Sequence, residues 1–521
     1  MTIGDRTRRL GERRRRRRIS FAALAVPLAL AVVALAVFRF GGFGGDDDGR
    51  PVARGEPVAE ETDPAENEVE PPPPAASPTP GPINEGIEGL TTFRGNATRT
   101  YYGEGPLPKD PEILWRFPES GGMCSTSTDQ NGERTWCGTG WTGQPNVVEV
   151  EGRTEVRFGA YDRGVHVLDA ETGKAVYETF PTGDIIKGTV TSDPDGYPLL
   201  YTGSRDNYLR VLALDRGDRP VELWRLSSDS APNPVWNNDW DGSPLVIDDY
   251  LLEGGENSWF YVVKLNREYD DRGRVTVDPQ VRVTVPGFDQ QLFSELGDNE
   301  VSIESSVAFH DGVAYFANSG GLVQGWDVSR VLDGKRKARR VFRFWTGEDT
   351  DATVVIDDEG FLYVASELER MNARSREVGQ LMKLDPASRK DPVVWAIPIP
   401  GEGGDGGIWA TPALHGDALF VTTNTGRLLA VDRGRGKIAW EIELPPPTWS
   451  SPAVIDDTLL VADCSGELHA YVLRDDPLSG IPEERWSVEL GSCIESTPAV
   501  WRGMIYVGTR GGAVYAIGDR G

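Results

Sequence analysis

Short apolar runs separated by glycine-containing turns are the main pattern along this chain, and its last residues show the pattern most clearly. Three runs of β-branched and aromatic residues follow one another there, at 498–500, 504–508 and 513–517. Arg502-Gly503 separates the first two runs, and Arg510-Gly511-Gly512 separates the last two. Short strands bounded by glycine turns are typical of antiparallel hairpins. The stretch therefore predicts three antiparallel strands.

The same pattern occurs eight times from Leu90 onward. Each copy starts with a small residue before a Pro or Val, here called the anchor position, and continues through three apolar runs and two turns. The anchor positions are Pro145, Val190, Pro244, Val307, Val354, Pro412, Pro452 and Pro498. A fourth run often ends in tryptophan, at Trp224, Trp345, Trp395, Trp440 and Trp486. Repeats of about 40–50 residues with four strands each are typical of propeller blades. We therefore predict an all-β fold, an eight-bladed β-propeller over 90–521.

The last copy lacks a fourth run, because the sequence ends at Gly521 where that strand would begin. A matching run, Pro111-Glu-Ile-Leu-Trp-Arg-Phe117, stands before the first copy and contains the expected tryptophan. Pairing this run with 513–517 would close the ring and cover a sheet edge that could otherwise pair with another chain. We predict that 111–117 is the outer strand of the last blade.

The N-terminal residues differ from the rest in charge and hydropathy. Residues 1–18 carry nine arginines between Arg6 and Arg18, whereas the whole chain has a net charge of −27. Residues 19–38 contain no charged side chain, and twenty such residues are enough to span a bilayer core of about 30 Å. Residues 39–89 are acidic and Pro-rich, which favours an extended, disordered linker.

These features predict a single-pass membrane protein. Arginine before the apolar span and acid after it place the N-terminus in the cytoplasm and the propeller outside. The alternative is a cleaved signal peptide, since Ala34-Leu-Ala36 resembles a cleavage site, but the apolar run exceeds the usual length of about 7–15 residues. The acidic body lacks the basic stripe that a nucleic-acid-binding protein needs.

The repeats resemble those of a known family. Its motifs are Asp169-Ala-Glu-Thr-Gly-Lys174, Ser450-Ser-Pro-Ala-Val454 and Tyr506-Val-Gly-Thr509. They resemble the repeat of pyrroloquinoline-quinone (PQQ) dehydrogenases and of their cofactor-free relatives, including the BamB-type lipoprotein of outer-membrane protein assembly. Phe93-Arg-Gly-Asn96, leading to Leu114-Trp115-Arg116, is similar to the first segment of membrane-anchored, cofactor-free members. The resemblance implies a PQQ-like propeller over Leu90–Gly521 and leaves the function open.

Blade topology indicates which face could bind a partner. In each blade, the leading loop before the inner strand and the turn between the second and third strands lie on one face, here called the loop rim. The long irregular segments fall on this face, and long loops often carry function. The residues three positions before each anchor should meet near the axis: Thr142, Lys187, Asp241, Glu304, Asp351, Trp409, Trp449 and Glu495.

Crowded carboxylates repel one another and are relieved by a cation or a bound basic group. The simpler interpretation is a solvated channel mouth in an acidic protein. Asn237 to Gly242 with Asp248 matches part of a calcium-loop pattern, but Ser243–Ile247 is needed as an inner strand, so the match is not favoured. Metal binding by the cysteines is not supported by their spacing.

The four cysteines suit two disulfides in an oxidising compartment. Cys124 and Cys137 would fix the segment leading to the first blade. Cys464 lies in a turn on the loop rim and Cys493 just before the next inner strand, so this bond would join the seventh and eighth blades.

Three functions are compatible with this sequence. We favour a non-catalytic, membrane-anchored scaffold for envelope assembly or protein binding, with envelope or secreted proteins docking on Trp236, Trp240, Trp409 and Trp449, because tryptophan dominates binding hot spots. The alternatives are a PQQ-dependent dehydrogenase and a cell-wall carbohydrate-binding propeller. PQQ is disfavoured, because the alcohol-oxidising quinoproteins use adjacent cysteines, which this chain lacks, and because a tricarboxylate suits an acidic axis poorly. We expect neither PQQ nor calcium as a cofactor.

Overall fold

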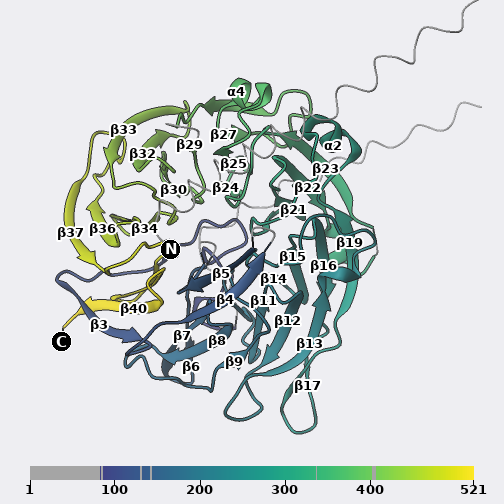
Figure 1. The fold of residues 1–521 in the computed structure, drawn as a ribbon, viewed down its shortest axis with the longest axis vertical. Helices are drawn as coiled ribbons and strands as arrows, with labels where there is room; N and C mark the ends of the chain where they lie inside the picture. The colour runs from purple at the N-terminus through teal and green to yellow at the C-terminus, as the bar shows by residue number, and fades with distance from the viewer. Residues whose placement is uncertain are drawn as a thin grey trace, which may run out of the picture. The chain divides into compact units, whose positions relative to one another are not determined.

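Eight antiparallel sheets follow one another along the chain and form the ring of a β-propeller (Figure 1). The structure is a computed structural model that describes residues 83, 86–129, 132–140, 143–335, 337–401 and 406–520. The predicted basic segment, the apolar span 19–38 and the linker up to residue 82 lie outside the described residues. No helix in the described part is long and apolar enough to cross a membrane. The predicted eight-bladed, all-β architecture is confirmed.

Each blade has four principal strands, ordered from the axis outward as they follow in the sequence. The first four blades use β6 (Asn146–Val150), β7 (Arg153–Gly159), β8 (Gly164–Asp169) and β9 (Phe180–Pro181); β10 (Thr191–Ser192), β11 (Leu199–Gly203), β12 (Tyr208–Ala213) and β13 (Val221–Ser227); β14 (Leu245–Ile247), β15 (Tyr250–Gly254), β16 (Trp259–Lys264) and β19 (Gln280–Pro286); and β20 (Ala308–His310), β21 (Val313–Phe316), β22 (Leu322–Asp327) and β23 (Arg339–Trp345).

The remaining blades repeat this order. Blades 5 to 8 use β24 (Val355–Ile356), β25 (Leu362–Ala365), β27 (Leu381–Leu384) and β28 (Val393–Ile397); β30 (Ala413–His415), β31 (Ala418–Thr422), β32 (Arg427–Asp432) and β33 (Lys437–Glu443); β34 (Ala453–Ile455), β35 (Thr458–Ala462), β36 (Glu467–Val472) and β37 (Glu483–Glu489); and β38 (Ala499–Trp501), β39 (Met504–Thr509), β40 (Ala513–Asp519) and β3 (Pro111–Phe117).

Additional short elements lie in the loops. They are η1 (Ser228–Ser230), α2 (Gln290–Leu296), α3 (Ser329–Leu332) and α4 (Ala373–Val378), and the strand pairs β4 (Cys124–Asp129) with β5 (Gly132–Cys137), β17 (Glu268–Tyr269) with β18 (Val275–Thr276), and β26 (Glu367–Leu368) with β29 (Gly406–Gly407). Helices α2 and α4 begin with side-chain caps, since Asp289 accepts from Leu292 N and Asn372 from Ser375 N. Both helices lie in segments that the sequence predicts as long loop-rim loops.

The core lies between neighbouring blades, because the middle strands are buried on both faces. In β31 and β35 every residue is buried, whereas the outer strand β33 alternates and buries only Trp440 fully. One apolar cluster joins blades 6, 7 and 8 through Phe420, Leu460 and Ile505. Adjacent sheets therefore stabilise each other by the burial of both sheet faces.

The outer-strand tryptophans join each blade to the next. Four of them donate their indole N–H to a carbonyl of the following blade: Trp395 to Arg433 O at 2.8 Å, Trp440 to Pro477 O at 2.8 Å, Trp486 to Pro108 O at 3.0 Å and Trp115 to Ala170 O at 2.9 Å. A glycine must lie beneath the ring. Gly173 has φ +68°, and a Cβ there would come within 2.7 Å of Trp115. This contact explains the glycine of the repeat motif.

The ring closes as the sequence predicts. Strand β3 pairs antiparallel with β40, with Glu112 opposite Gly518 and Phe117 opposite Val514. On the axis side, β2 (Gly103–Glu104) pairs parallel with β38. The N-terminal residues thus supply both the innermost and the outermost strand of blade 8. The predicted closure is confirmed.

Residues 89–104 fill the axis instead of leaving a solvated channel. Strand β1 (Gly89–Leu90) pairs with the inner strand of blade 1. Arg94 and Arg99 are fully buried and donate to backbone carbonyls of several blades: Arg94 to Thr411 O and Pro412 O, and Arg99 to Ser243 O and Val307 O. Ser192 N, Phe309 N and Ile356 N donate to carbonyls of this segment. The inner strands end short of the axis, so their unpaired polar groups bond to this segment.

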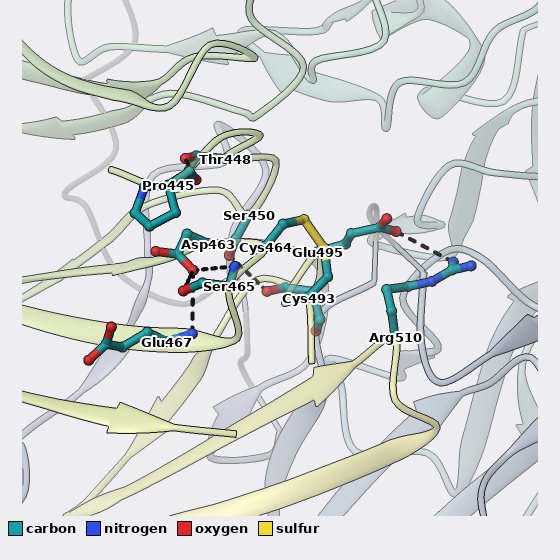
Figure 2. Close-up of a disulfide and its surroundings, with 11 residues drawn as sticks. Pro445, Thr448, Ser450, Asp463, Cys464, Ser465, Glu467, Cys493, Glu495 and Arg510 are labelled. Carbon is teal, nitrogen blue, oxygen red and sulfur yellow. Dashed lines mark hydrogen bonds and ion pairs between the residues drawn. A yellow bond between two sulfur atoms is a disulfide. The ribbon is translucent and has the colours of Figure 1, made fainter. Parts of the chain in front are cut away.

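Both predicted disulfides are present. Cys124 and Cys137 face each other across the β4–β5 hairpin, which precedes blade 1. Cys464 bonds to Cys493 and joins the loop rim of blade 7 to that of blade 8 (Figure 2). Among the described residues no cysteine is free.

We predict that Trp115→Ala weakens the last blade before any other. The substitution removes the bond to Ala170 O and the packing against Tyr506, whose ring lies 5.9 Å from the indole. The expected loss is about 3 kcal/mol in the free energy of unfolding, the low end for truncating a core tryptophan. Hydrogen exchange should show lost protection in β38–β40 and unchanged protection in β31–β32.

Ile113→Thr on the same strand is the matched control, because Ile113 is 39% exposed. It should change the unfolding free energy by less than about 0.5 kcal/mol. Equal loss of protection in all blades of the Trp115 variant would contradict the closure by β3.

Candidate functional site

Three buried carboxylates of blade 3 surround a lysine from blade 2 at the loop rim. We call Asp239, Asp241 and Glu256 the blade 3 triad. The Nζ atom of Lys187 lies 3.0 Å from Asp239 Oδ2, 2.5 Å from Asp241 Oδ2 and 2.8 Å from Glu256 Oε1. Arg205 Nε donates to Asp239 Oδ2 at 2.7 Å. All five side chains are buried. Two cations from blade 2 therefore hold the leading loop of blade 3 in place.

The electrostatics keep Lys187 charged. Burial and the neighbouring Arg205 act to lower the pKa of Lys187, but the three carboxylates outweigh them and raise it well above its ordinary value. Asp241 responds in the opposite sense, since burial and then the charge of Glu256 raise its pKa despite Lys187. A buried charge that loses its partner is strongly destabilising, so each member of this cluster depends on the others.

A second group of carboxylates lies at the loop rim of blade 5. We call Asp349, Asp351 and Glu367 the blade 5 triad. One carboxylate oxygen from each lies within 4.8 Å of the others. Glu304, from the leading loop of blade 4, reaches the same place, because Ser319 Oγ lies 3.3 Å from Glu304 Oε1 and 3.4 Å from Asp351 Oδ1. Four carboxylates from two blades thus come together.

Burial is the main cause of the altered acidity in this second group. Burial and the adjacent Asp349 raise the pKa of Asp351 well above its ordinary value. Burial and the charges of Asp351 and Glu256 raise the pKa of Glu304 to about 8. The naming of Glu256 here shows that the blade 3 and blade 5 triads are close enough to interact.

The predicted tryptophans differ in their exposure. Trp409 is buried, and its Nε1 lies 3.2 Å from Asp351 Oδ2; Trp449 is half-buried and meets it edge to face at a ring distance of 5.0 Å. Trp240 is fully buried against Tyr261, with ring centroids 5.4 Å apart. Trp240 and Trp409 are therefore not exposed to a docking partner. Trp236 is half-buried and has a φ of 81°.

Glu495 lies apart from the two triads. Its Oε2 is 3.5 Å from Arg510 Nη1, next to the Cys464–Cys493 bond (Figure 2). The two carboxylate groups and Lys187 are thus brought together as the leading-loop positions predict, while Glu495 has its own arginine. Thr142 lies outside the described residues.

The β4–β5 hairpin is a part of this site that sequence reasoning missed. Its Trp136 lies between three arginines, with guanidinium-to-ring distances of 4.4 Å for Arg134, 5.2 Å for Arg205 and 5.1 Å for Arg510. The hairpin thereby contacts blade 2 and blade 8 and lies near the centre of the ring (Figure 1). The dipeptide Asn131-Gly132 is a strong hairpin signal and could have predicted it.

Comparisons with known proteins agree with the repeat pattern. A family model described as PQQ_2, outer membrane protein assembly factor BamB, matches residues 290–441 and 377–476. These residues run from the leading loop of blade 4 into blade 7 and carry PQQ-like repeats. The serine/threonine-protein kinase AfsK of Streptomyces griseus is 29% identical over 220 residues, which are 39% of this chain and 23% of that protein. The chain thus spans less than a quarter of that relative.

Solved structures share the fold at low identity. The quinohemoprotein alcohol dehydrogenase of Comamonas testosteroni is 14% identical, with a TM-score of 0.53, covering 83% of this chain and 81% of the enzyme. A europium-containing methanol dehydrogenase is 13% identical, with a TM-score of 0.53, covering 83% of this chain and 98% of the enzyme. At these identities the likeness shows the fold alone.

We predict that Lys187→Met destabilises the protein strongly. Removal of the ammonium leaves three buried carboxylates with one cation fewer, and breaking a buried ion pair costs about 3–5 kcal/mol. Urea unfolding followed by tryptophan fluorescence measures the loss. Lys187→Arg, which keeps the charge, should recover part of it.

Lys437→Met, which removes an exposed lysine at the start of β33, is the control and should change the unfolding free energy by less than about 0.5 kcal/mol. If Lys187→Met were as stable as the parent chain, the triad could not depend on Lys187.

Proposed function

We propose that this PQQ-like propeller is a non-catalytic scaffold that binds a protein partner at its loop rim. Trp236 carries the proposal. Its φ of 81° lies in the left-handed region, which bulky residues rarely adopt. Bonds on both sides hold it there, since Val235 N donates to Asn257 O and Asn237 N to Glu256 O. Backbone strain that the surrounding structure maintains is concentrated at functional sites.

The exposure of the two remaining indoles supports this proposal. Trp236 and Trp449 are both half-buried on leading loops of the loop rim. Each presents part of a large, rigid ring to the outside while its base is fixed, and such residues commonly dominate binding energy. Trp449 is additionally oriented by its edge-to-face contact with Trp409. The surface is therefore preorganised for a partner.

The family match supports the same class of function, because its description is that of an outer membrane protein assembly factor. We propose that the partner is an envelope or secreted protein. We further propose that residues 19–38 anchor the chain in the cell membrane with the propeller outside the cytoplasm, which suits the two disulfides.

PQQ does not fit the donor set at the axis. PQQ carries three carboxylates and needs cationic contacts. Lys187 and Arg205 are bonded to the blade 3 triad, and Arg510 pairs with Glu495. The Cys464–Cys493 bond joins residues 29 apart rather than adjacent cysteines. A calorimetric titration of the full chain with PQQ and calcium discriminates the two functions, and saturable binding of PQQ would overturn the scaffold proposal.

We predict that a partner contacts the loop rim through Trp449. A photo-cross-linkable residue placed at 449 in the full chain, in cells, should yield one dominant adduct, identifiable by mass spectrometry. The same residue at Tyr269, which is 54% exposed on the β17–β18 hairpin, is the control and should not yield it.

The purified partner should then bind Trp236→Ala/Trp449→Ala about 30-fold more weakly than the parent chain, the factor that corresponds to a loss of about 2 kcal/mol. Tyr269→Ala should leave the affinity unchanged. Unchanged affinity of the double variant would place the docking surface elsewhere.

A further inference from the structure

The blade 3 and blade 5 triads occupy the same positions of the repeat. Asp239 and Asp241 stand five and three residues before the anchor Pro244, and Asp349 and Asp351 stand five and three before the anchor Val354. The glutamates correspond as well. Glu256 lies two residues after β15 ends at Gly254, and Glu367 lies two residues after β25 ends at Ala365. The chain therefore builds one three-carboxylate arrangement twice.

The two copies differ in the charge that the preceding blade supplies. Lys187 stands three residues before the anchor Val190 of blade 2 and places its ammonium among the carboxylates of blade 3. The same position of blade 4, three before the anchor Val307, is Glu304. Where the blade 3 triad receives a cation, the blade 5 triad meets a fourth carboxylate.

We propose that the blade 5 triad binds a divalent cation, best matched by calcium, in the place that the Lys187 ammonium holds in blade 3. The oxygen positions suit such an ion. Calcium–oxygen distances of about 2.3–2.6 Å allow two ligand oxygens to be at most about 5 Å apart. The three carboxylate oxygens lie within 4.8 Å of one another. An ion between them would link the leading loops of blades 4 and 5.

Two oxygens that lack hydrogen-bond donors point to the same ligand. Asp349 Oδ1 is buried and has no hydrogen-bond partner. Asn424 Oδ1, from the turn between the second and third strands of blade 6, is also buried without a partner, and its Nδ2 lies 3.4 Å from Glu367 Oε2. Carboxylate and amide oxygens are the ligands that calcium prefers. Burying such groups without a partner is costly, and an ion removes that cost.

Nearby cationic side chains are bonded to other carboxylates. Arg370, in the turn that follows Glu367, lies 2.9 Å from Asp298 Oδ2 and 3.6 Å from Glu300 Oε2. The proposal needs no quinone and does not depend on partner docking, because it rests on residues of blades 4 to 6 alone.

The test measures calcium binding to the full-length chain after treatment with a chelator. Titration with calcium chloride should give one site per chain with a Kd below about 1 mM, the weak end of extracellular calcium modules. Calcium should also raise Tm, because a ligand that binds only the folded state stabilises it. Asp349→Asn should weaken binding by at least about tenfold, since ligand charge sets calcium affinity.

Glu304→Lys distinguishes the proposal from a folding defect. It installs the lysine of the equivalent blade 2 position, so the variant should bind no calcium and, with chelator present, should have a Tm equal to or above that of the parent chain. Glu377→Lys, the same change at a glutamate of α4 that is 69% exposed in its side chain, is the control and should bind calcium as the parent chain does.

Three results would overturn the proposal. The first is the absence of both binding heat and a Tm change in the parent chain up to about 10 mM calcium, ten times the weakest expected Kd. The second is unchanged affinity in Asp349→Asn. The third is calcium binding by Glu304→Lys equal to that of the parent chain.

Discussion

The pairing of β3 with β40 is the contact on which the rest of the ring depends. A propeller buries its apolar faces only between neighbouring blades, so the last blade must meet the first. Here the outer strand of blade 8 comes from residues that precede blade 1. The same strand carries Trp115, whose indole bonds to Ala170 O of blade 1. One strand therefore completes a sheet and also joins the two ends of the ring.

This closure also determines what lies on the axis. Residues 89–104 connect β1, on the inner strand of blade 1, with β2, on the inner strand of blade 8. Between these points the buried Arg94 and Arg99 satisfy carbonyls of blades 3, 4 and 6. Because the axis is filled, the polar chemistry is confined to the loop rim, where the charged leading-loop residues meet.

The repeat pattern predicts the blades, the closing strand and both disulfides, because each depends on local strand periodicity or on position within the repeat. It also brings Lys187, Asp241, Glu304 and Asp351 to one rim. The burial of Trp240 follows from strand alternation that the prediction did not use. Asp239 and Asp241 face Lys187, so Trp240 between them faces the opposite way, into the blade interface. The filling of the axis depends on long-range carbonyl partners, which have no local signal. The β4–β5 hairpin did have one, in Asn131-Gly132.

The position of β3 has a consequence for biosynthesis. This strand is among the first parts of the propeller to leave the ribosome, whereas its partner β40 is the last. Ile113 and Leu114 must therefore remain without their sheet while some four hundred residues are translated, roughly 20–80 s at about 5–20 residues per second. Contacts so distant in sequence slow folding and expose strand edges to aggregation. A nascent chain of this protein cannot finish its fold blade by blade, and the time before β40 emerges is when a chaperone would protect it.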